Sequence, residues 1–257
     1  ETSFDNYQQA LIRGMRRRAA ADGIQLHIFD CNSSDQNSGS SGFKDSVFRL
    51  VEQSRLDGLI VFTGALINQG SSGEFVSMLD LFSGIPRVSL SIALDGIHSI
   101  VIDNFRASKE LISHLINDHG YRRIAYVCGP LANQEALDRF AAYRECLSEA
   151  GLPYDPELVF SGDFDKASGI EAMNRLLESG RDFDAVAAAD DVMALGALEV
   201  LQARGFSVPA KTALVGFDDI DLASCTSPPL TTMRQPVFEM GETAVDIISN
   251  LLAGKEQ

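Results

Sequence analysis

The chain has 257 residues, a length that at about 150 residues per domain suggests one large or two modest domains. Hydrophobic residues make up 45% and charged residues 22%, which excludes the disordered and fibrous classes. Asp and Glu number 36 against 21 Lys and Arg, so the formal charge is −15. No positive surface is in excess to hold phosphates, and this segment by itself is a poor candidate for DNA binding.

The sequence contains no run of about 18 to 20 apolar residues and no apolar signal-peptide core at its start. Four widely spaced cysteines form no CxxC pair, and we expect reduced thiols, no bound metal and no cofactor: Cys31, Cys128, Cys146 and Cys225. These features favour a soluble cytoplasmic protein with no membrane partner, although a secreted protein can also lack disulfides.

Short β-rich runs alternate with longer helical patterns, which predicts an α/β fold built from βαβ units with parallel sheets. Most of the runs are continuously apolar, as strands covered on both faces are. The expected strands are Ile24–Asp30, Gly58–Phe62, Pro86–Leu90, Ile100–Ile102, Ile124–Cys128, Ala185–Ala189 and Ala213–Phe217.

Apolar residues spaced three and four apart predict helices over Asn6–Ala20 and over Ala107–His119. The same spacing predicts a third helix that contains Leu147 and ends at Gly151. Asn32–Gly42 and Gly64–Gly73 read as flexible loops. Because a doubly wound sheet normally opens with a strand and none precedes Asn6–Ala20, we expect the chain to be a fragment that lacks its opening strand.

Motifs of the standard enzyme classes are absent: the sequence has no GxSxG elbow, no P-loop, no HExxH and no GxGxxG after a strand. The four histidines, His27, His98, His114 and His119, fall on different elements. A solitary histidine on a helix is more often structural or solvated than catalytic. We therefore expect no catalytic residue.

Two carboxylate pairs follow expected strands, at the strand ends where ligands collect in open α/β sheets. Asp190 and Asp191 come after one strand, and Asp218 and Asp219 come after another. One member of each pair is as readily explained by helix capping, because Asp accepts backbone N–H bonds at a helix start. The other member is then free to accept hydrogen bonds from ligand hydroxyls.

Arg139 and Phe164 complete the set of candidates from the residues alone. Arg139 can donate to an oxygen-rich ligand, and the alternative is a solvated surface salt bridge. Phe164 can stack on a sugar or base, and the alternative is core packing. This mixture suits a neutral polyhydroxylated ligand. A Ca²⁺ site, formed by these carboxylates with Asp221, is a weaker alternative because the spacing matches no EF-hand loop.

Several runs carry a resemblance to a known family. They include AAADDVMALGALEVLQARGFSVP and the signature GFDDI, SPPLTT and QP at Gly216–Ile220, Ser227–Thr232 and Gln235–Pro236. From Asn6 to Gly254 the chain resembles the effector-binding core of the lac-repressor/galactose-repressor family. The middle of the first lobe, DGLIVFTGALINQGSSGEF followed by IPRVSLSIALDGIHSIVIDN, is more similar to a subgroup that serves as sensors in bacterial signalling proteins.

The resemblance implies a periplasmic-binding-protein-like type I fold, in which two Rossmann-like lobes are hinged around a ligand cleft. The N-terminal lobe would comprise residues 1–103 and 235–257, and the C-terminal lobe residues 104–234. The crossovers would fall near Asp103–Asn104, at Thr232–Gln235 and just past Gly254. The family's helix-turn-helix headpiece and its final strand are not in this chain.

The resemblance also implies which residues contact the ligand. Carried over by position, they are Phe4, Asp5, Tyr7, Ser89, Arg139, Phe164, Asp190, Asp218 and Gln235. The family usually has Asn where this chain has Asp190, which adds a carboxylate to the pocket.

The expected function is therefore non-enzymatic sensing of a small molecule, a sugar or polyol, by a bacterial transcriptional regulator. Lobe closure on the ligand would control DNA binding, with a homodimer formed through the N-terminal lobe. The alternatives are a sensor domain of a histidine kinase or diguanylate cyclase type of protein, a periplasmic solute-binding protein, and a metal-assisted hydrolase that uses the Asp cluster.

Overall fold

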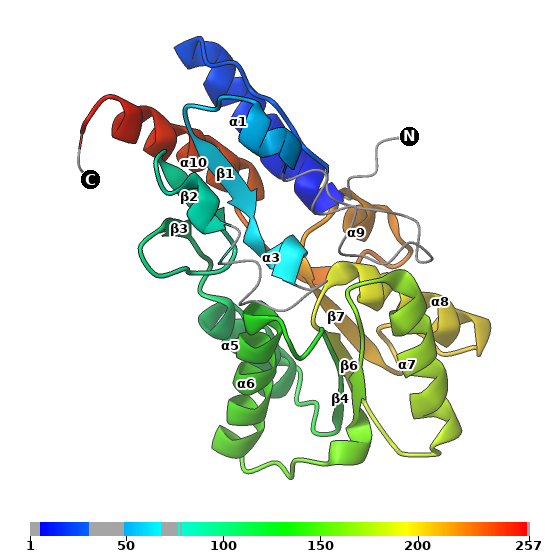
Figure 1. Cartoon of the computed structure of the whole chain (residues 1–257). Coiled ribbons are helices and arrows are strands. Elements are labelled where there is room, and N and C mark those ends of the chain that lie inside the picture. The colour runs from blue at the N-terminus through cyan, green and yellow to red at the C-terminus, as the bar shows by residue number, and fades with distance from the viewer. Residues whose placement is uncertain (1–5, 31–48, 68–76, 78, 256–257) are drawn as a thin grey trace. The chain divides into compact units, whose positions relative to one another are not determined.

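The computed structural model describes residues 6–30, 49–67, 77 and 79–255, and Figure 1 shows the chain. It divides into two compact units. Unit 1 comprises Glu1–Val101 and Pro236–Gln257, and unit 2 comprises Ile102–Gln235. None of the described helices is long and apolar enough to cross a membrane.

Unit 1 contains a parallel sheet of order β1-β2-β3. Its described elements are α1 (Asn6–Asp22), β1 (Leu59–Phe62), α3 (Thr63–Ile67), the 3₁₀ helix η1 (Asp80–Phe82), β2 (Arg87–Leu90), β3 (His98–Ile100) and α10 (Val237–Leu252).

Helices α1 and α10 lie side by side in unit 1, although they come from opposite ends of the chain. Two glycines allow the close approach, because a Cβ on Gly14 would lie 2.0 Å from the Phe238 carbonyl oxygen, and one on Gly241 would lie 2.2 Å from that of Leu11. The Arg17 guanidinium also forms two hydrogen bonds of 2.5 Å to the Glu242 carboxylate. The two helices are therefore joined by both packing and charge.

Unit 2 contains a five-stranded parallel sheet of order β5-β4-β6-β7-β8. Helices α5 and α6 pack together, as do α7 and α8, and the two pairs lie on opposite sides of the sheet (Figure 1). The elements are α5 (Asn104–Ser113), the π-helix η2 (His114–Asp118), β4 (Ile124–Cys128), α6 (Gln134–Glu149), the 3₁₀ helix η3 (Pro156–Leu158), β5 (Val159–Ser161), α7 (Lys166–Glu178), β6 (Ala185–Ala188), α8 (Asp191–Ala203), β7 (Ala213–Asp218), α9 (Asp221–Cys225) and β8 (Thr231–Arg234).

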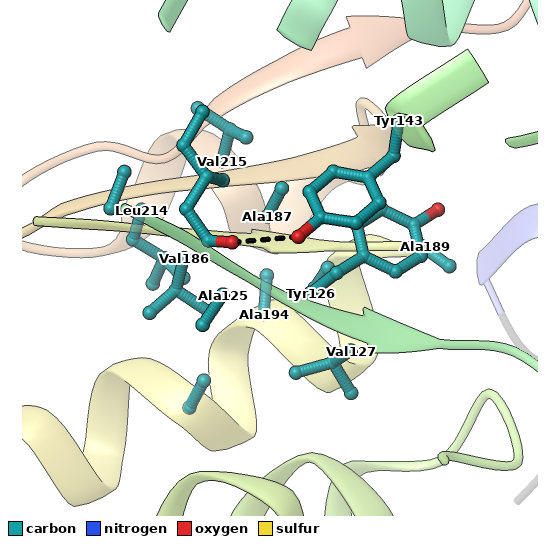
Figure 2. Close-up of a cluster of buried hydrophobic side chains, with 14 of the residues drawn as sticks. Ala125, Tyr126, Val127, Tyr143, Val186, Ala187, Ala189, Ala194, Leu214 and Val215 are labelled. Atoms are coloured by element: carbon teal, nitrogen blue, oxygen red, sulfur yellow. Dashed lines mark hydrogen bonds between the residues drawn. The ribbon is translucent and has the colours of Figure 1, made fainter. Parts of the chain in front are cut away.

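The core of unit 2 forms where these helices cover the central strands, as Figure 2 shows. Every residue of β4 and β6 is buried, in keeping with their uninterrupted apolar sequences. Small alanines dominate β6, and the rings of Tyr126 and Tyr143 stack 4.7 Å apart beside it. The Tyr143 hydroxyl donates a hydrogen bond of 2.9 Å to the Ile124 carbonyl oxygen.

The expected α/β class and parallel sheets are confirmed, but the expected strand Ile24–Asp30 is wrong. Residues 24–30 are described and belong to no strand. A cavity of about 660 Å³ is lined by Gly23–Asp30 and by β1. Neighbouring strands lie about 4.8 Å apart when they exchange hydrogen bonds, and among the described residues β1 pairs with β2 and not with this segment.

Other boundaries also differ from the sequence-based expectations. The expected strand Ile100–Ile102 forms instead over His98–Ile100. The first residues of the expected loop Gly64–Gly73 belong to helix α3, which ends at Ile67. Strand β5 is not among the expected strands, whereas β8 begins one residue before the crossover that the resemblance implies at Thr232–Gln235. The expected helix Ala107–His119 begins earlier, at Asn104, and changes to a π-helix at His114. The expected loop Asn32–Gly42 lies outside the described residues.

Replacing Tyr143 with Phe tests the packing of unit 2. The Ile124 carbonyl oxygen would lose its buried donor, and we expect the free energy of unfolding to fall by about 1 to 2 kcal/mol, measured by urea denaturation. The matched control is Tyr154→Phe, because Tyr154 is 42% exposed. Equal stability of Tyr143→Phe and wild type would contradict this role for the hydroxyl.

Candidate functional site

Five predicted site residues gather at one edge of the unit 2 sheet. All five strands are parallel, so their carboxyl ends meet there. Each strand supplies one residue: Arg139 from the helix after β4, Phe164 after β5, Asp190 after β6, Asp218 at the end of β7, and Gln235 directly after β8. This is the edge at which open α/β sheets bind ligands.

Arg139 is the central polar residue of this edge and is only 4% exposed. Its Nε donates to Asn104 Oδ1 at 2.8 Å, and its Nη1 donates to the Ala189 carbonyl oxygen at 2.7 Å. Nη1 also lies 3.7 Å from Asp218 Oδ1. The alternative of a solvated surface salt bridge is therefore wrong, because this guanidinium is held inside the fold by three partners.

Aromatic rings enclose the same guanidinium. Its Cζ atom lies 4.0 Å from the centroid of the Phe217 ring and 5.9 Å from that of Phe164. Both distances permit cation–π attraction, which strengthens where water is excluded. Phe164 is half-buried and packs partly on the core, so its packing and its place at the site coexist.

Asp190 and Asp191 begin helix α8 and use their carboxylates differently. Asp190 is the N-cap residue, and its Oδ1 accepts a hydrogen bond of 2.8 Å from the Met193 backbone N–H. Asp191 Oδ2 accepts from the Ile220 N–H at 3.0 Å. Asp191 Oδ1 is buried without a hydrogen-bond partner among the described residues. The capping interpretation thus holds for one member of this pair.

The second pair caps no helix. Asp218 Oδ1 accepts a hydrogen bond of 2.5 Å from the side-chain amide of Gln235. Asp219 instead pairs with Arg234, at 2.5 Å from Nε to Oδ2. The helix that follows, α9, has Ile220 at its N-cap and no side-chain cap bond. Capping is therefore wrong for this pair, and Asp218 faces Arg139 and Gln235.

Burial raises the pKa of three carboxyl groups at this edge. Desolvation raises the pKa of Asp190 to about 7 and that of Asp191 to about 6, from an ordinary value of 3.8. Desolvation also raises the pKa of Asp218 well above its usual range, and the nearby Arg139 charge opposes that rise. The carboxyl groups therefore hold protons near neutral pH more readily than exposed ones do.

The backbone is strained at the same edge. Phe164 has φ of 62°, and Asp218 and Asp219 have φ of 119° and 57°. Residues other than Gly rarely adopt positive φ, and where they do, the strain tends to lie at functional sites. Gly129 makes room for the aromatic ring, because a Cβ there would lie 2.4 Å from the Phe164 ring.

The remaining predicted site residues belong to unit 1. The Tyr7 hydroxyl is 3.2 Å from Ser91 Oγ. Ser89 is fully buried, and its Oγ lies 2.6 Å from both Thr63 Oγ1 and the Ile92 carbonyl oxygen. Phe4 and Asp5 lie outside the described residues.

Sequence reasoning missed Asn104 and Glu135 as parts of this site. Asn104 is 2% exposed and accepts from Arg139, while its amide donates to Glu135 Oε1 at 3.3 Å. Burial raises the pKa of Glu135 above its ordinary value. The sequence places Asn104 only at an expected crossover. The structure shows that helix α5 begins at this residue, with Asp103 as its N-cap.

The calcium alternative gains no support from the geometry. Across the residues that the structure describes, no group of three or more His, Cys, Asp or Glu side chains is arranged to hold a metal ion. Asp219, a member of the proposed cluster, is paired with Arg234.

Comparison with known proteins supplies relatives for this fold and site. The family described as periplasmic binding protein-like domain matches residues 112–257. The HTH-type transcriptional regulator CelR of Thermobifida fusca is 36% identical over 80% of this chain and 62% of its own length. The ribose operon repressor of Escherichia coli K12 is 30% identical over 96% of this chain and 72% of its own length.

A solved structure of a CelR–cellobiose complex matches 98% of this chain and 74% of its own, with 30% identity and a TM-score of 0.83. The expected periplasmic-binding-protein-like fold is confirmed by these matches. The two curated relatives are named as a transcriptional regulator and an operon repressor.

The raised pKa values predict that stability falls as pH rises. Between the unfolded pKa of about 4 and the folded values of about 6 and 7, the folded state holds protons that the unfolded state releases. Raising the pH from 5 to 8 therefore favours unfolding through these groups, measurable as a falling urea midpoint. In Asp190→Asn, which keeps a capping oxygen, we expect a flatter pH profile. An unchanged profile in that variant would contradict the burial argument.

Proposed function

Because this chain belongs to the LacI family of transcriptional regulators, we propose that the site at the carboxyl edge of the unit 2 sheet binds a neutral sugar or a related polyol as an effector. Two of the related proteins have a sugar in their names, ribose for the operon repressor and cellobiose for the CelR complex. The identity of those sugars is a property of those proteins and serves here to choose probes.

The strongest support is a set of hydrogen-bonding atoms that the fold leaves unused around Arg139. Gln235 Oε1 is buried without a partner among the described residues. Arg139 commits Nε and Nη1 to the protein, and within the described chain its Nη2 makes no hydrogen bond. Asp190 commits Oδ1 to the helix cap and leaves Oδ2. The residues around Arg139 thus offer one unused donor group and two unused acceptor atoms, a combination that suits vicinal hydroxyl groups.

The charges favour a neutral ligand over a strongly anionic one. Arg139 lies beside the buried carboxyl groups of Asp190 and Asp218, which repel an anionic ligand whenever they are ionised. A sugar also has an apolar face that can stack on the half-buried Phe164 ring, as aromatic side chains commonly allow.

We propose that the effector acts by shifting a population of conformations. A ligand favours one conformation only by binding it more tightly than the other. The predicted lobes, residues 1–103 with 235–257 and residues 104–234, are the bodies we propose to move, with Tyr7 and Ser89 of the first lobe as further contacts. The proposed readout is altered DNA binding by the protein as a whole, in the cytoplasm.

The ligand test is isothermal titration of the chain with D-ribose, cellobiose, other neutral sugars and ribose 5-phosphate. A neutral sugar that binds should also raise Tm by about 5 to 10 °C at 100 times its Kd, because that occupancy adds about 2.7 kcal/mol. Binding of the phosphate ester in preference to every neutral sugar would contradict the proposed ligand class.

Variants locate the binding within the site. Arg139→Ala should abolish binding, and Phe164→Ala should weaken it about three- to tenfold through lost stacking. The matched controls are Arg144→Ala and Tyr154→Ala, which alter a cation–π pair with ring and guanidinium 5.2 Å apart elsewhere in unit 2. Unchanged affinity in a folded Phe164→Ala variant would contradict the placement of the sugar against that ring.

We also propose a homodimer formed through unit 1. Leu50 and Leu81 are exposed there at 56% and 65%, and a partner surface would cover such apolar side chains. Sedimentation of the chain should give the mass of a dimer, and Leu81→Glu should shift it toward the monomer. A monomeric wild-type chain at tens of micromolar would contradict this interface.

A further inference from the structure

A pair of histidines lies at the end of helix α5, where the chain continues as the π-helix η2 (His114–Asp118). A π-helix bonds residues five apart and is wider than an α-helix, so the first residue of η2 and the one just past its end fall on the same face. Those two residues are His114 and His119. Their Nε2 atoms are 3.1 Å apart, and their rings meet edge to face with centroids separated by 4.5 Å.

Asp118 determines which nitrogen of His114 carries the proton. Its Oδ2 lies 2.8 Å from His114 Nδ1, and a carboxylate accepts hydrogen bonds, so Nδ1 carries the hydrogen. Neutral His114 therefore presents the lone pair of Nε2 to His119. In turn His119 Nε2 donates its hydrogen across the 3.1 Å contact.

We propose that His114 and His119 form a binding site for a divalent first-row transition-metal ion, coordinated by both Nε2 atoms. Metal–nitrogen bonds of about 2.0 to 2.1 Å at angles of 90° to 109° place two imidazole nitrogens about 2.9 to 3.4 Å apart. The observed separation of 3.1 Å lies within that range. The rings need little movement to accept a metal in place of the shared hydrogen.

Binding requires no net loss of a proton from the neutral pair. The hydrogen on His119 Nε2 moves to His119 Nδ1 through solvent, and both Nε2 lone pairs are then free for the metal. His114 keeps its Nδ1 hydrogen on Asp118, an arrangement of carboxylate, imidazole and metal that orients the ring. Tyr121 lies against the other ring, with its centroid 5.9 Å from that of His119.

The exposure of the pair sets the class of metal. The side chains of His114 and Asp118 are 41% and 66% exposed, so water completes the coordination. Two imidazoles with water ligands suit Cu²⁺, Ni²⁺ and Zn²⁺, whereas Mg²⁺ and Ca²⁺ prefer oxygen ligands. By the usual order of stability, Cu²⁺ should bind tightest.

This pair is separate from the proposed effector site. It lies beyond the last residue of helix α5, whereas the effector site includes Asn104 at the first residue of that helix. A bound metal would link the start and the end of the π-helix and so stabilise unit 2 against unfolding, without contacting the effector site.

The test is calorimetric titration of the full chain with NiCl₂, with MgCl₂ as the metal control and Tm as a second readout. We expect one Ni²⁺ per chain and a raised Tm with Ni²⁺ but not with Mg²⁺. Binding should be lost in both His114→Ala and His119→Ala, and Asp118→Asn should weaken it about tenfold, as loss of an orienting carboxylate does. His98→Ala removes an exposed histidine of unit 1 and should leave the affinity unchanged.

No Ni²⁺ binding by wild type would overturn the proposal, as would unchanged affinity in the His114 and His119 variants. Loss of binding in His98→Ala would place the metal elsewhere and overturn it equally. Sugar binding by His114→Ala should match that of wild type, which separates this site from the effector site.

Discussion

The structure of unit 2 depends on one buried positive charge. Arg139 is 4% exposed, and an unpaired charge in that position would cost several kcal/mol. Its guanidinium is therefore matched by an amide oxygen of Asn104, a backbone carbonyl at Ala189 and the carboxyl group of Asp218. These partners come from α5, the end of β6 and the end of β7, so one side chain holds three elements in register at the carboxyl edge of the sheet.

The same constraint connects the strain and the perturbed carboxyl groups. The carboxyl group of Asp218 reaches Arg139 from a residue with φ of 119°, a conformation that costs free energy. Asp190 and Asp191 are buried beside it at the start of α8, and burial raises the pKa of both. Backbone strain and buried carboxyl groups both lower the stability of the folded state at this edge. A ligand that bonds to the unused polar atoms there would raise the free energy of unfolding.

Much of unit 2 was predictable because its signals are local and strong. The runs at Ile124–Cys128 and Ala185–Ala189 are continuously apolar, as doubly covered strands must be, and both formed strands close to the expected bounds. Once the strands are placed, the topology alone brings the residues that follow them to one edge. That is why Arg139, Asp190 and Asp218 could be predicted to lie together.

The features that were missed depend on partners distant in sequence. Strand β8 reads TTMR, a short polar run with no core-facing stripe, so its residues alone do not predict a strand, and the structure pairs it with β7. Conversely, Ile24–Asp30 has a strand's composition but pairs with no strand in the described part of the chain. The sequence around Asn104 does not indicate that its side chain accepts a hydrogen bond from Arg139. The periodicity of Ala107–His119 likewise does not indicate the change to a π-helix at His114.

The most direct test of Arg139 as the organising residue is a double-mutant cycle in the free energy of unfolding, with Arg139→Met, Asp218→Asn and the double variant. Removing the guanidinium alone should cost about 3 to 5 kcal/mol, because it leaves buried carboxyl groups without their cation. The double variant should recover at least about 1 kcal/mol relative to the sum of the two single effects. Strictly additive effects would contradict the account, because Arg139 and Asp218 would then be energetically independent.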